Sequence, residues 1–227
     1  MNQYNQPNYI PPIKDRLMIF ARRFPVSACF IVLSILISLP LILKFDLNIK
    51  IPYIYDFIYS NLRITASLYK SGLHEISNGH LYRLVTPILL HFSVMHIVFN
   101  MFAMYYLGAV VEFRQKRWFY IVLLIGFGVI SNICQYYVDG PRFGGMSGVI
   151  YGLFGYIWMQ QKFNPKFGLF LEKQVIIIVI VWYVLCFTGW VGPIANTAHT
   201  IGLVLGILFG ILVAFVPQKQ LFFKQIN

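Results

Sequence analysis

The chain has 227 residues, of which 59% are hydrophobic and only 11% charged, and its mean hydropathy is +0.70. This composition excludes a soluble globular domain and predicts an integral membrane protein. The net charge of +11 does not indicate nucleic-acid binding, because the basic residues lie in short loops between apolar runs. Anionic membrane lipid explains that charge better.

Six apolar segments come close to the ~20 residues that a helix needs to cross ~30 Å of hydrocarbon. We therefore predict an all-α membrane protein with six transmembrane helices, because a helix satisfies its own backbone hydrogen bonds in lipid. The segments are 24–43, 93–111, 118–138, 147–159, 174–190 and 197–216. They define a membrane domain over 24–216, which lies between a polar amino-terminal segment, 1–23, and a short tail, 217–227.

The basic residues predict how the bundle is oriented. With the amino terminus in the cytoplasm, 12 of the 18 Lys and Arg residues fall on the cytoplasmic side. The positive-inside rule therefore places both termini in the cytoplasm. Segment 24–43 is too long for the core of a signal peptide, so we expect it to remain as a membrane anchor.

The connection 44–92 between the first two segments is long for a loop. It carries amphipathic stretches rich in aromatic residues, such as 53–59. We expect this first outer loop to lie partly in the membrane interface.

Two polar side chains share one face of the second segment. His96 and Asn100 are four residues apart, near the outer end of that helix. Both can donate hydrogen bonds, and donors fixed in a site of low dielectric stabilise the negative charge that acyl transfer develops on a carbonyl oxygen. The structural alternative is that they only bond one helix to another. For His91, just before them, the alternative is a place in the membrane interface.

The fourth segment is too short to span the membrane alone. From Ser147 to the polar residues that begin at Gln160 there are about 13 residues, roughly 20 Å of helix against ~30 Å of hydrocarbon. With the Gln160 end at the inner surface, Ser147 lies ~10 Å below the outer surface, at the end of the descending loop 139–145. Irregular backbone at that depth must line protein or water.

Glycines recur on the fourth and sixth segments at helical spacing. Gly148 and Gly152 mark one face of the fourth, and Gly202, Gly206 and Gly210 mark one face of the sixth. Such faces allow two helix backbones to approach closely, and ordinary helix packing is a sufficient reason for them.

Ser147 and His199 adjoin these two glycine faces. The proximity of the faces predicts that the two side chains meet. A nucleophile and a base are both costly at membrane depth, and an ionisable side chain there indicates a functional site. The pattern therefore favours hydrolysis inside a membrane, with Ser147 attacking and His199 removing its proton.

Three motifs resemble the signatures of rhomboid intramembrane serine proteases, in the order in which that family carries them. They are HFSVMHIVFN at 91–100, GMSG at 145–148 and AHTIG at 198–202. The chain is most similar to the bacterial six-helix type, and the resemblance covers roughly 24–216.

The resemblance implies a catalytic dyad, with Ser147 as the nucleophile and His199 as the general base. It makes His96 and Asn100 the oxyanion donors, and it implies that Tyr151 stacks against the catalytic histidine, for which core packing is a compatible alternative. Two further residues, Gly145 and His91, are expected to border the site. Tyr82-Arg83 stands where the family often has Trp-Arg in the first outer loop.

The sequence offers no evident acid for a triad. Asp139 lies in the loop before the site, and Glu112 lies near the opposite end of its helix. We therefore expect the base to be held by packing against Tyr151.

The resemblance also implies membrane-spanning protein substrates, cut near the outer part of their own helix, and no cofactor or metal. A substrate helix must unwind locally, and the fifth segment is the expected moving part of a lateral entrance. Residue usage and motifs indicate a bacterial inner membrane. We also expect the chain to contact membrane lipid and not to bind nucleic acid.

Two other functions compete with proteolysis. A catalytically silent rhomboid-like binder of transmembrane helices would lack the serine or the histidine, and both are present. A transporter would use His91, His96 and His199 as a proton or metal path, but His91 and His96 are five apart, an awkward spacing for two ligands on one face. The three cysteines, Cys29, Cys134 and Cys186, are far apart and indicate no disulfide framework or zinc site.

Overall fold

The computed structural model describes residues 11–49, 53–69 and 72–216, and these fold into helices joined by loops, with no strand among them. The predicted tail 217–227, residues 1–10 of the predicted amino-terminal segment, and Lys50 and Lys70 of the outer loop lie outside the described residues. The helices are α1 (Ile13–Arg23), α2 (Pro25–Phe45), α3 (Ile54–Leu62), α4 (His74–Ser77), η2 (Leu81–Leu84), η3 (Thr86–Leu89), α5 (Val94–Ala103), η4 (Met104–Gly108), α6 (Ala109–Arg114), α7 (Arg117–Asp139), α8 (Ser147–Phe163), η5 (Pro165–Phe167), α9 (Lys173–Cys186) and α10 (Asn196–Phe215).

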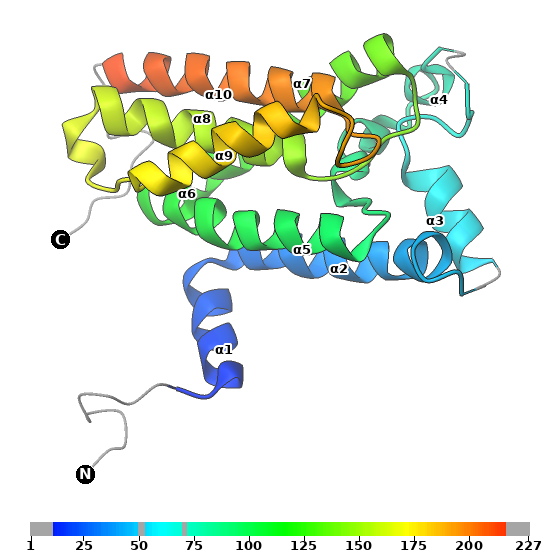
Figure 1. The fold of residues 1–227 in the computed structure, drawn as a ribbon, viewed down its shortest axis with the longest axis horizontal. Helices are drawn as coiled ribbons and strands as arrows, with labels where there is room; N and C mark the ends of the chain where they lie inside the picture. Colours follow the sequence, from blue (N-terminus) through cyan, green and yellow to red (C-terminus); the bar gives the residue numbers. More distant parts are fainter. Residues whose placement is uncertain (1–10, 50–52, 70–71, 217–227) are drawn as a thin grey trace.

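Four helices within the described residues are long and apolar enough to cross a membrane. They are α2, α7, α10 and the continuous helix Val94–Arg114, in which the π-helical η4 joins α5 to α6. Figure 1 shows the long helices lying along one common direction, whereas α1 runs away from the bundle across it. The predicted all-α fold is confirmed for the described residues, and four of its six predicted segments correspond to helices of spanning length.

The other two predicted segments form shorter helices whose ends differ from the prediction. Helix α8 begins at Ser147 but has 17 residues and continues past Met159 to Phe163. The reason is that Gln160 is fully buried and donates a hydrogen bond to the carbonyl oxygen of Gly210 on α10, at 2.7 Å. Its polar side chain therefore marks a helix contact and not the end of the helix.

Helix α9 ends at Cys186, four residues before the predicted end at Trp190. The Thr188 hydroxyl donates to the carbonyl of Leu185 at 2.7 Å, and Gly189 follows with φ +79°. A residue with positive φ shortly after a helix commonly ends it. The prediction missed this end because the sequence stays apolar beyond Cys186.

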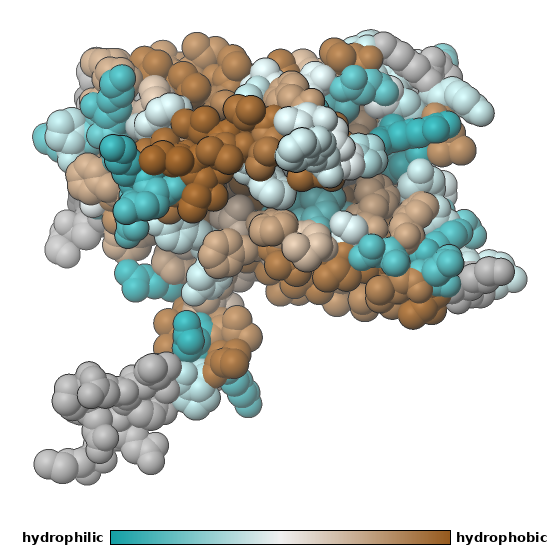
Figure 2. Space-filling view, in the orientation of Figure 1, coloured by the Kyte–Doolittle hydropathy of each residue, from teal (hydrophilic) through white to brown (hydrophobic). Residues whose placement is uncertain are grey.

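The outer surface of the bundle is strongly apolar. Large hydrophobic side chains are exposed along each of the long helices, among them Leu36 at 62%, Phe102 at 71% and Leu212 at 60%. Figure 2 shows hydrophobic residues gathered along the sides of the bundle and hydrophilic residues toward its two ends. This distribution is that of a protein surrounded by hydrocarbon.

Helices α8 and α10 form the closest contact in the bundle, and α7 packs beside both. A Cβ added at Gly202 would overlap the carbonyl oxygen of Gly148, and one at Gly206 would overlap that of Gly152. The two backbones therefore touch along the glycine faces that the sequence predicts, which brings the start of α8 against the start of α10.

The first outer loop is ordered by two buried arginines. Arg83 donates from Nη1 to the carbonyl oxygens of Ser60 and Arg63, at 2.9 and 3.0 Å. The guanidinium of Arg63 in turn donates to the carbonyls of Ala66 and Ser67, both at 2.8 Å. These bonds hold the segment after α3 in a fixed shape beside η2 and η3, which lead into the motif at 91–100.

At the opposite end of the bundle, Glu112 satisfies the amino terminus of α2. Its carboxylate accepts from the backbone N–H groups of Val26 and Ser27, at 2.9 and 2.8 Å, and from the Ser27 hydroxyl at 2.8 Å. The first N–H groups of a helix have no intrahelical acceptor, so a carboxylate placed there stabilises the helix end. Glu112 is thus committed to structure at the end far from Ser147.

Candidate active site

Ser147 is the first residue of α8, and a glycine-containing loop brings it into the bundle. The backbone N–H of Gly145 donates to the carbonyl of Pro87 at 2.9 Å, which anchors the loop to η3. Gly145 has φ +118°, and a Cβ there would lie 2.6 Å from the ring of His96. Only glycine therefore allows the backbone to lie against His96 at this position, two residues before the serine.

His199 lies in the first turn of α10 and faces Ser147. Its Nε2 is 2.8 Å from the Ser147 Oγ, although the two residues are 52 positions apart in the sequence. Only 5% of His199 is exposed. When Nε2 accepts the hydroxyl proton of the serine, the ring carries its own proton on Nδ1, which has no hydrogen-bond partner among the described residues.

The ring of His199 is held by an aromatic neighbour from α8. Tyr151 lies one turn after Ser147, and its ring centroid is 4.7 Å from that of His199, with 40° between the planes. Tyr183 of α9 packs edge-on against Tyr151, with the centroids 5.5 Å apart, and its hydroxyl lies 2.8 Å from that of Thr200. The histidine therefore sits against a ring that a second aromatic supports.

The start of α10 is fixed by polar side chains of α7. Gln135 accepts from the backbone N–H of Ala198 at 2.9 Å, and the Asp139 carboxylate accepts from the Thr197 hydroxyl at 2.8 Å. Gln135 also donates to Asp139 at 2.9 Å. Gln135 was not predicted as a site residue, although a glutamine within an apolar span was the available signal.

These contacts account for the side chain of Asp139. Its hydrogen bonds go to Gln135 and Thr197, so the carboxylate positions the helix that carries His199 and makes no hydrogen bond with the imidazole.

His96 and Asn100 lie on α5, on the side of the loop that precedes Ser147. The His96 ring lies so close to Gly145 that it would clash with any side chain at that position. Asn100 is 5% exposed, its Nδ2 donates to the His96 carbonyl at 2.8 Å, and its Oδ1 has no partner among the described residues. The bond from Asn100 stays within its own helix, so it does not serve to join two helices.

His91 is fully buried and links three segments, so its side chain packs inside the protein and is not exposed at its surface. Its backbone N–H donates to Ser38 Oγ of α2 at 3.0 Å, and its ring centroid is 4.9 Å from that of His96. The backbone N–H of Met146, next to the serine, approaches His91 Nε2 at 3.5 Å. His91 therefore supports the turn that presents Ser147.

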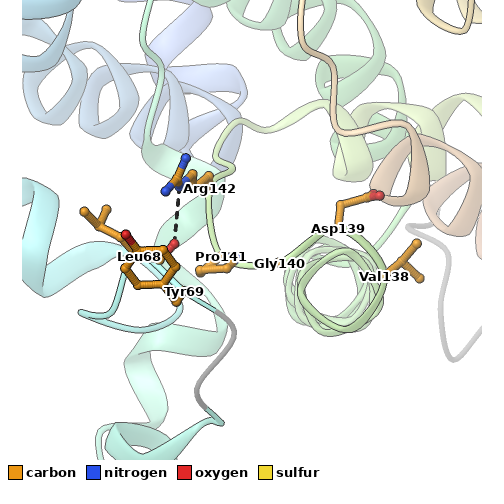
Figure 3. Close-up of a pocket in the computed structure, with 7 residues that line it drawn as sticks. All are labelled: Leu68, Tyr69, Val138, Asp139, Gly140, Pro141 and Arg142. Carbon is orange, nitrogen blue, oxygen red and sulfur yellow. Dashed lines mark hydrogen bonds between the residues drawn. The ribbon is translucent and has the colours of Figure 1, made fainter.

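A separate hollow opens at the Ser147 end of the bundle, between the loop that joins α2 to α5 and the loop after α7. It has a volume of about 340 Å³ and is lined by Leu68, Tyr69 and residues 138–142. Figure 3 shows Arg142 reaching toward Leu68, whose carbonyl accepts from Arg142 Nε at 3.2 Å, while Asp139 points to the other side. Neither Ser147 nor His199 lines this hollow.

Comparison with known proteins gives one family. A model of the Rhomboid domain matches residues 78–215. The chain is 39% identical over 140 residues to proteins named Rhomboid protease GlpG from Salmonella paratyphi A, Salmonella choleraesuis and Salmonella newport. Each match covers 61% of this chain and 51% of the relative, so the chain spans about half the length of these curated relatives.

Proposed function

Because the chain belongs to the rhomboid family, we propose that it is an intramembrane serine endopeptidase that works through a Ser-His dyad. The observation that carries this proposal is the 2.8 Å contact between His199 Nε2 and Ser147 Oγ inside an apolar bundle. A serine hydroxyl becomes a useful nucleophile when a neutral imidazole can take its proton, and this distance permits that transfer.

The first half of the reaction acylates the enzyme. Ser147 Oγ attacks the carbonyl carbon of the substrate peptide while its proton moves to His199 Nε2. The oxyanion of the tetrahedral intermediate receives hydrogen bonds from His96, from Asn100 and from the backbone N–H of Ser147, which begins α8 and has no intrahelical acceptor. The C–N bond then breaks, and the imidazolium gives its proton to the leaving amine.

The second half releases the product. Water attacks the acyl ester, its proton moves to His199, and the proton returns to Ser147 Oγ as the carboxylic acid product leaves. No carboxylate takes part, since Asp139 is bonded to Gln135 and Thr197, and stacking on Tyr151 keeps the imidazole aligned. Chemistry of this kind needs neither a cofactor nor a metal.

The substrates in this proposal are membrane-spanning proteins cut near the outer end of their own helix. A substrate helix reaches Ser147 by a lateral opening beside α9. Within α9 only Cys186 is buried, while Ile178, Val181 and Val184 are more than half exposed, so this helix is the least embedded of those around the site. Substrate residues with low helix propensity favour the local unwinding that cleavage needs.

In this proposal α8 and α9 complete a bundle of six membrane helices, with both termini on the cytoplasmic side of a bacterial inner membrane. The exposed basic residues at the α1 end of the bundle support this orientation through the positive-inside rule. The outer rim then faces away from the cytoplasm and carries the site.

Labelling with a fluorophosphonate probe tests the dyad. Purified protein in detergent should be labelled, and both Ser147→Ala and His199→Ala should abolish the labelling while the thermal unfolding temperature changes little. Cys29→Ala, a change in an exposed residue of α2 near the Glu112 end of the bundle, serves as the matched control and should keep the wild-type rate. Wild-type protein that is well folded but never labelled would refute the protease and would favour a silent binder of transmembrane helices.

A further inference from the structure

Helix α1 (Ile13–Arg23) lies outside the bundle and is amphipathic. Ile13, Leu17 and Phe20 share one face, at positions i, i+4 and i+7. Ile13 and Leu17 are 73% and 59% exposed. The bundle therefore leaves most of the apolar face of this helix uncovered.

One contact fixes which way that face points. The Phe20 ring is buried and stacks on Tyr105 of η4, with the centroids 4.3 Å apart. The Arg23 guanidinium, less than one turn further on, lies 5.0 Å from the centroid of the Phe113 ring. In the continuous helix Val94–Arg114, Tyr105 lies eight residues before Phe113, or about 12 Å deeper from the helix end.

The depth of these two contacts orients α1 relative to the membrane. The face of α1 that carries Phe20, Ile13 and Leu17 points toward the membrane interior, where Tyr105 lies. Arg23 lies at the level of Phe113, near the end of the helix Val94–Arg114. Figure 1 shows α1 lying across the common direction of the long helices, as a helix in the plane of a membrane surface must. In Figure 2, hydrophobic and hydrophilic residues occur side by side over this helix.

The charge of α1 identifies what covers it. The helix carries four basic residues and one acidic residue, Asp15, and the basic side chains Lys14, Arg16, Arg22 and Arg23 are all exposed. An amphipathic helix with a basic polar side lies in the interface of an anionic leaflet, with its apolar side in the acyl chains.

We propose that α1 is a membrane-surface helix that binds anionic lipid headgroups in the leaflet at the Glu112 end of the bundle. Ile13 and Leu17 enter the acyl region on the side where Phe20 meets η4, and the basic side chains contact phosphate groups of the surrounding lipid. The occupant of the exposed face is thus a lipid surface and not a protein. This role does not depend on the proposed protease activity.

Spin labels on two faces of α1 test the orientation. In the 227-residue chain, with its three cysteines replaced by alanine, a label is attached at Leu17→Cys or, as the matched control on the opposite face, at Arg22→Cys. The protein is reconstituted in vesicles of phosphatidylcholine mixed with phosphatidylglycerol. The label at position 17 should be accessible to oxygen and shielded from a water-soluble nickel chelate, and the label at position 22 should show the reverse.

The dependence on anionic lipid is the second part of the test. Each basic residue near an anionic surface shifts the bound population about fivefold. Replacing Lys14, Arg16 and Arg22 by Gln should therefore weaken surface binding on the order of 100-fold, which would raise the mobility and chelate accessibility of the label at position 17. Arg23 is left unchanged because it packs on Phe113. Vesicles of phosphatidylcholine alone, or high salt, should shift the label in the same direction.

Three results would overturn the proposal. Equal chelate accessibility at positions 17 and 22 in anionic vesicles would show that the apolar face does not enter lipid. Dipolar broadening between labels at position 17 would assign the face to a second copy of the chain. Shielding that is unchanged by the triple Gln variant and by lipid charge would show that the basic side chains do not bind headgroups.

Discussion

The glycine contact between α8 and α10 gives the sharpest test of how the fold produces the site. In Gly202→Ala, the new methyl group would overlap the carbonyl oxygen of Gly148, an atom of the α8 backbone. No side-chain rotation can relieve a clash between a Cβ and a backbone carbonyl. The two helices must therefore separate, on the order of 1 Å, at the level where one carries Ser147 and the other His199.

The size of the effect follows from two terms. Overpacking a close contact costs about 1–3 kcal/mol of folding stability. A displacement of about 1 Å between reacting groups costs on the order of 100-fold in rate. Because the hydrogen bond between His199 Nε2 and Ser147 Oγ is only 2.8 Å long, we expect the loss of activity to exceed what the loss of folded protein explains.

The assay compares the rate of fluorophosphonate labelling, and of cleavage of a transmembrane substrate, with the unfolding temperature in the same detergent. Gly126→Ala is the matched control, because a Cβ at this glycine of α7 meets nothing within 4 Å. It should leave the rate unchanged and stabilise the helix slightly. Wild-type labelling by Gly202→Ala at an unchanged unfolding temperature would refute the reasoning that the glycine contact sets the distance between the two helices.

Four further substitutions distinguish residues that take part in the proposed reaction from residues that position or stabilise the helices. Asn100→Ala should lower kcat about 100- to 1000-fold with little change in KM, as loss of one oxyanion donor does, and steady-state kinetics check this. Asp139→Asn should lower kcat less than about tenfold, whereas the same change in a triad acid costs about 10,000-fold, so a loss near that size would place the carboxylate in the chemistry. Glu112→Gln should lower the unfolding temperature, through about 1–3 kcal/mol of lost hydrogen bonding at the start of α2, while labelling per folded molecule stays constant. Burial acts to raise the pKa of Glu75 in the loop between α2 and α5, but hydrogen bonds from Ala66 and Thr65 lower this pKa overall. The ionised Glu75 therefore stabilises the folded protein above the unfolded pKa, and this stabilisation is lost as the pH falls through the folded pKa. Glu75→Gln should remove this acid dependence from the unfolding temperature.

The sequence predicts the helical elements well because hydrocarbon leaves the backbone few options. Hydropathy alone places α2, α7, α10 and the helix Val94–Arg114 within a few residues. Helix ends are predicted less well where a polar residue serves a buried contact, as Gln160 does with Gly210. Helix α1 was not predicted, because its basic residues also serve as topology signals and its few apolar residues fall short of a spanning segment.

Some positions of the site residues could be predicted from the sequence, and others could not. The glycine spacing predicts that the starts of α8 and α10 approach each other, since small residues at every fourth position leave no other close-packed face. Gln135 could not be assigned a partner from sequence, because its hydrogen bond to the Ala198 N–H depends on how α7 and α10 cross. The shape of the first outer loop could not be predicted either, because it depends on hydrogen bonds from Arg63 and Arg83 to backbone carbonyls.

Glu112 and His199 show two different uses of a buried polar side chain. At the α1 end, the Glu112 carboxylate accepts three hydrogen bonds from Val26 and Ser27 and serves stability. At the other end, His199 Nδ1 is buried without a hydrogen-bond partner among the described residues, and Nε2 of the same ring lies 2.8 Å from Ser147 Oγ. Such atoms cost free energy in a folded protein, and folding stability gives no reason to keep them. The placement of His199 beside Ser147 is therefore better explained by the proposed reaction than by folding stability, which is why His199→Ala should change the rate more than the unfolding temperature.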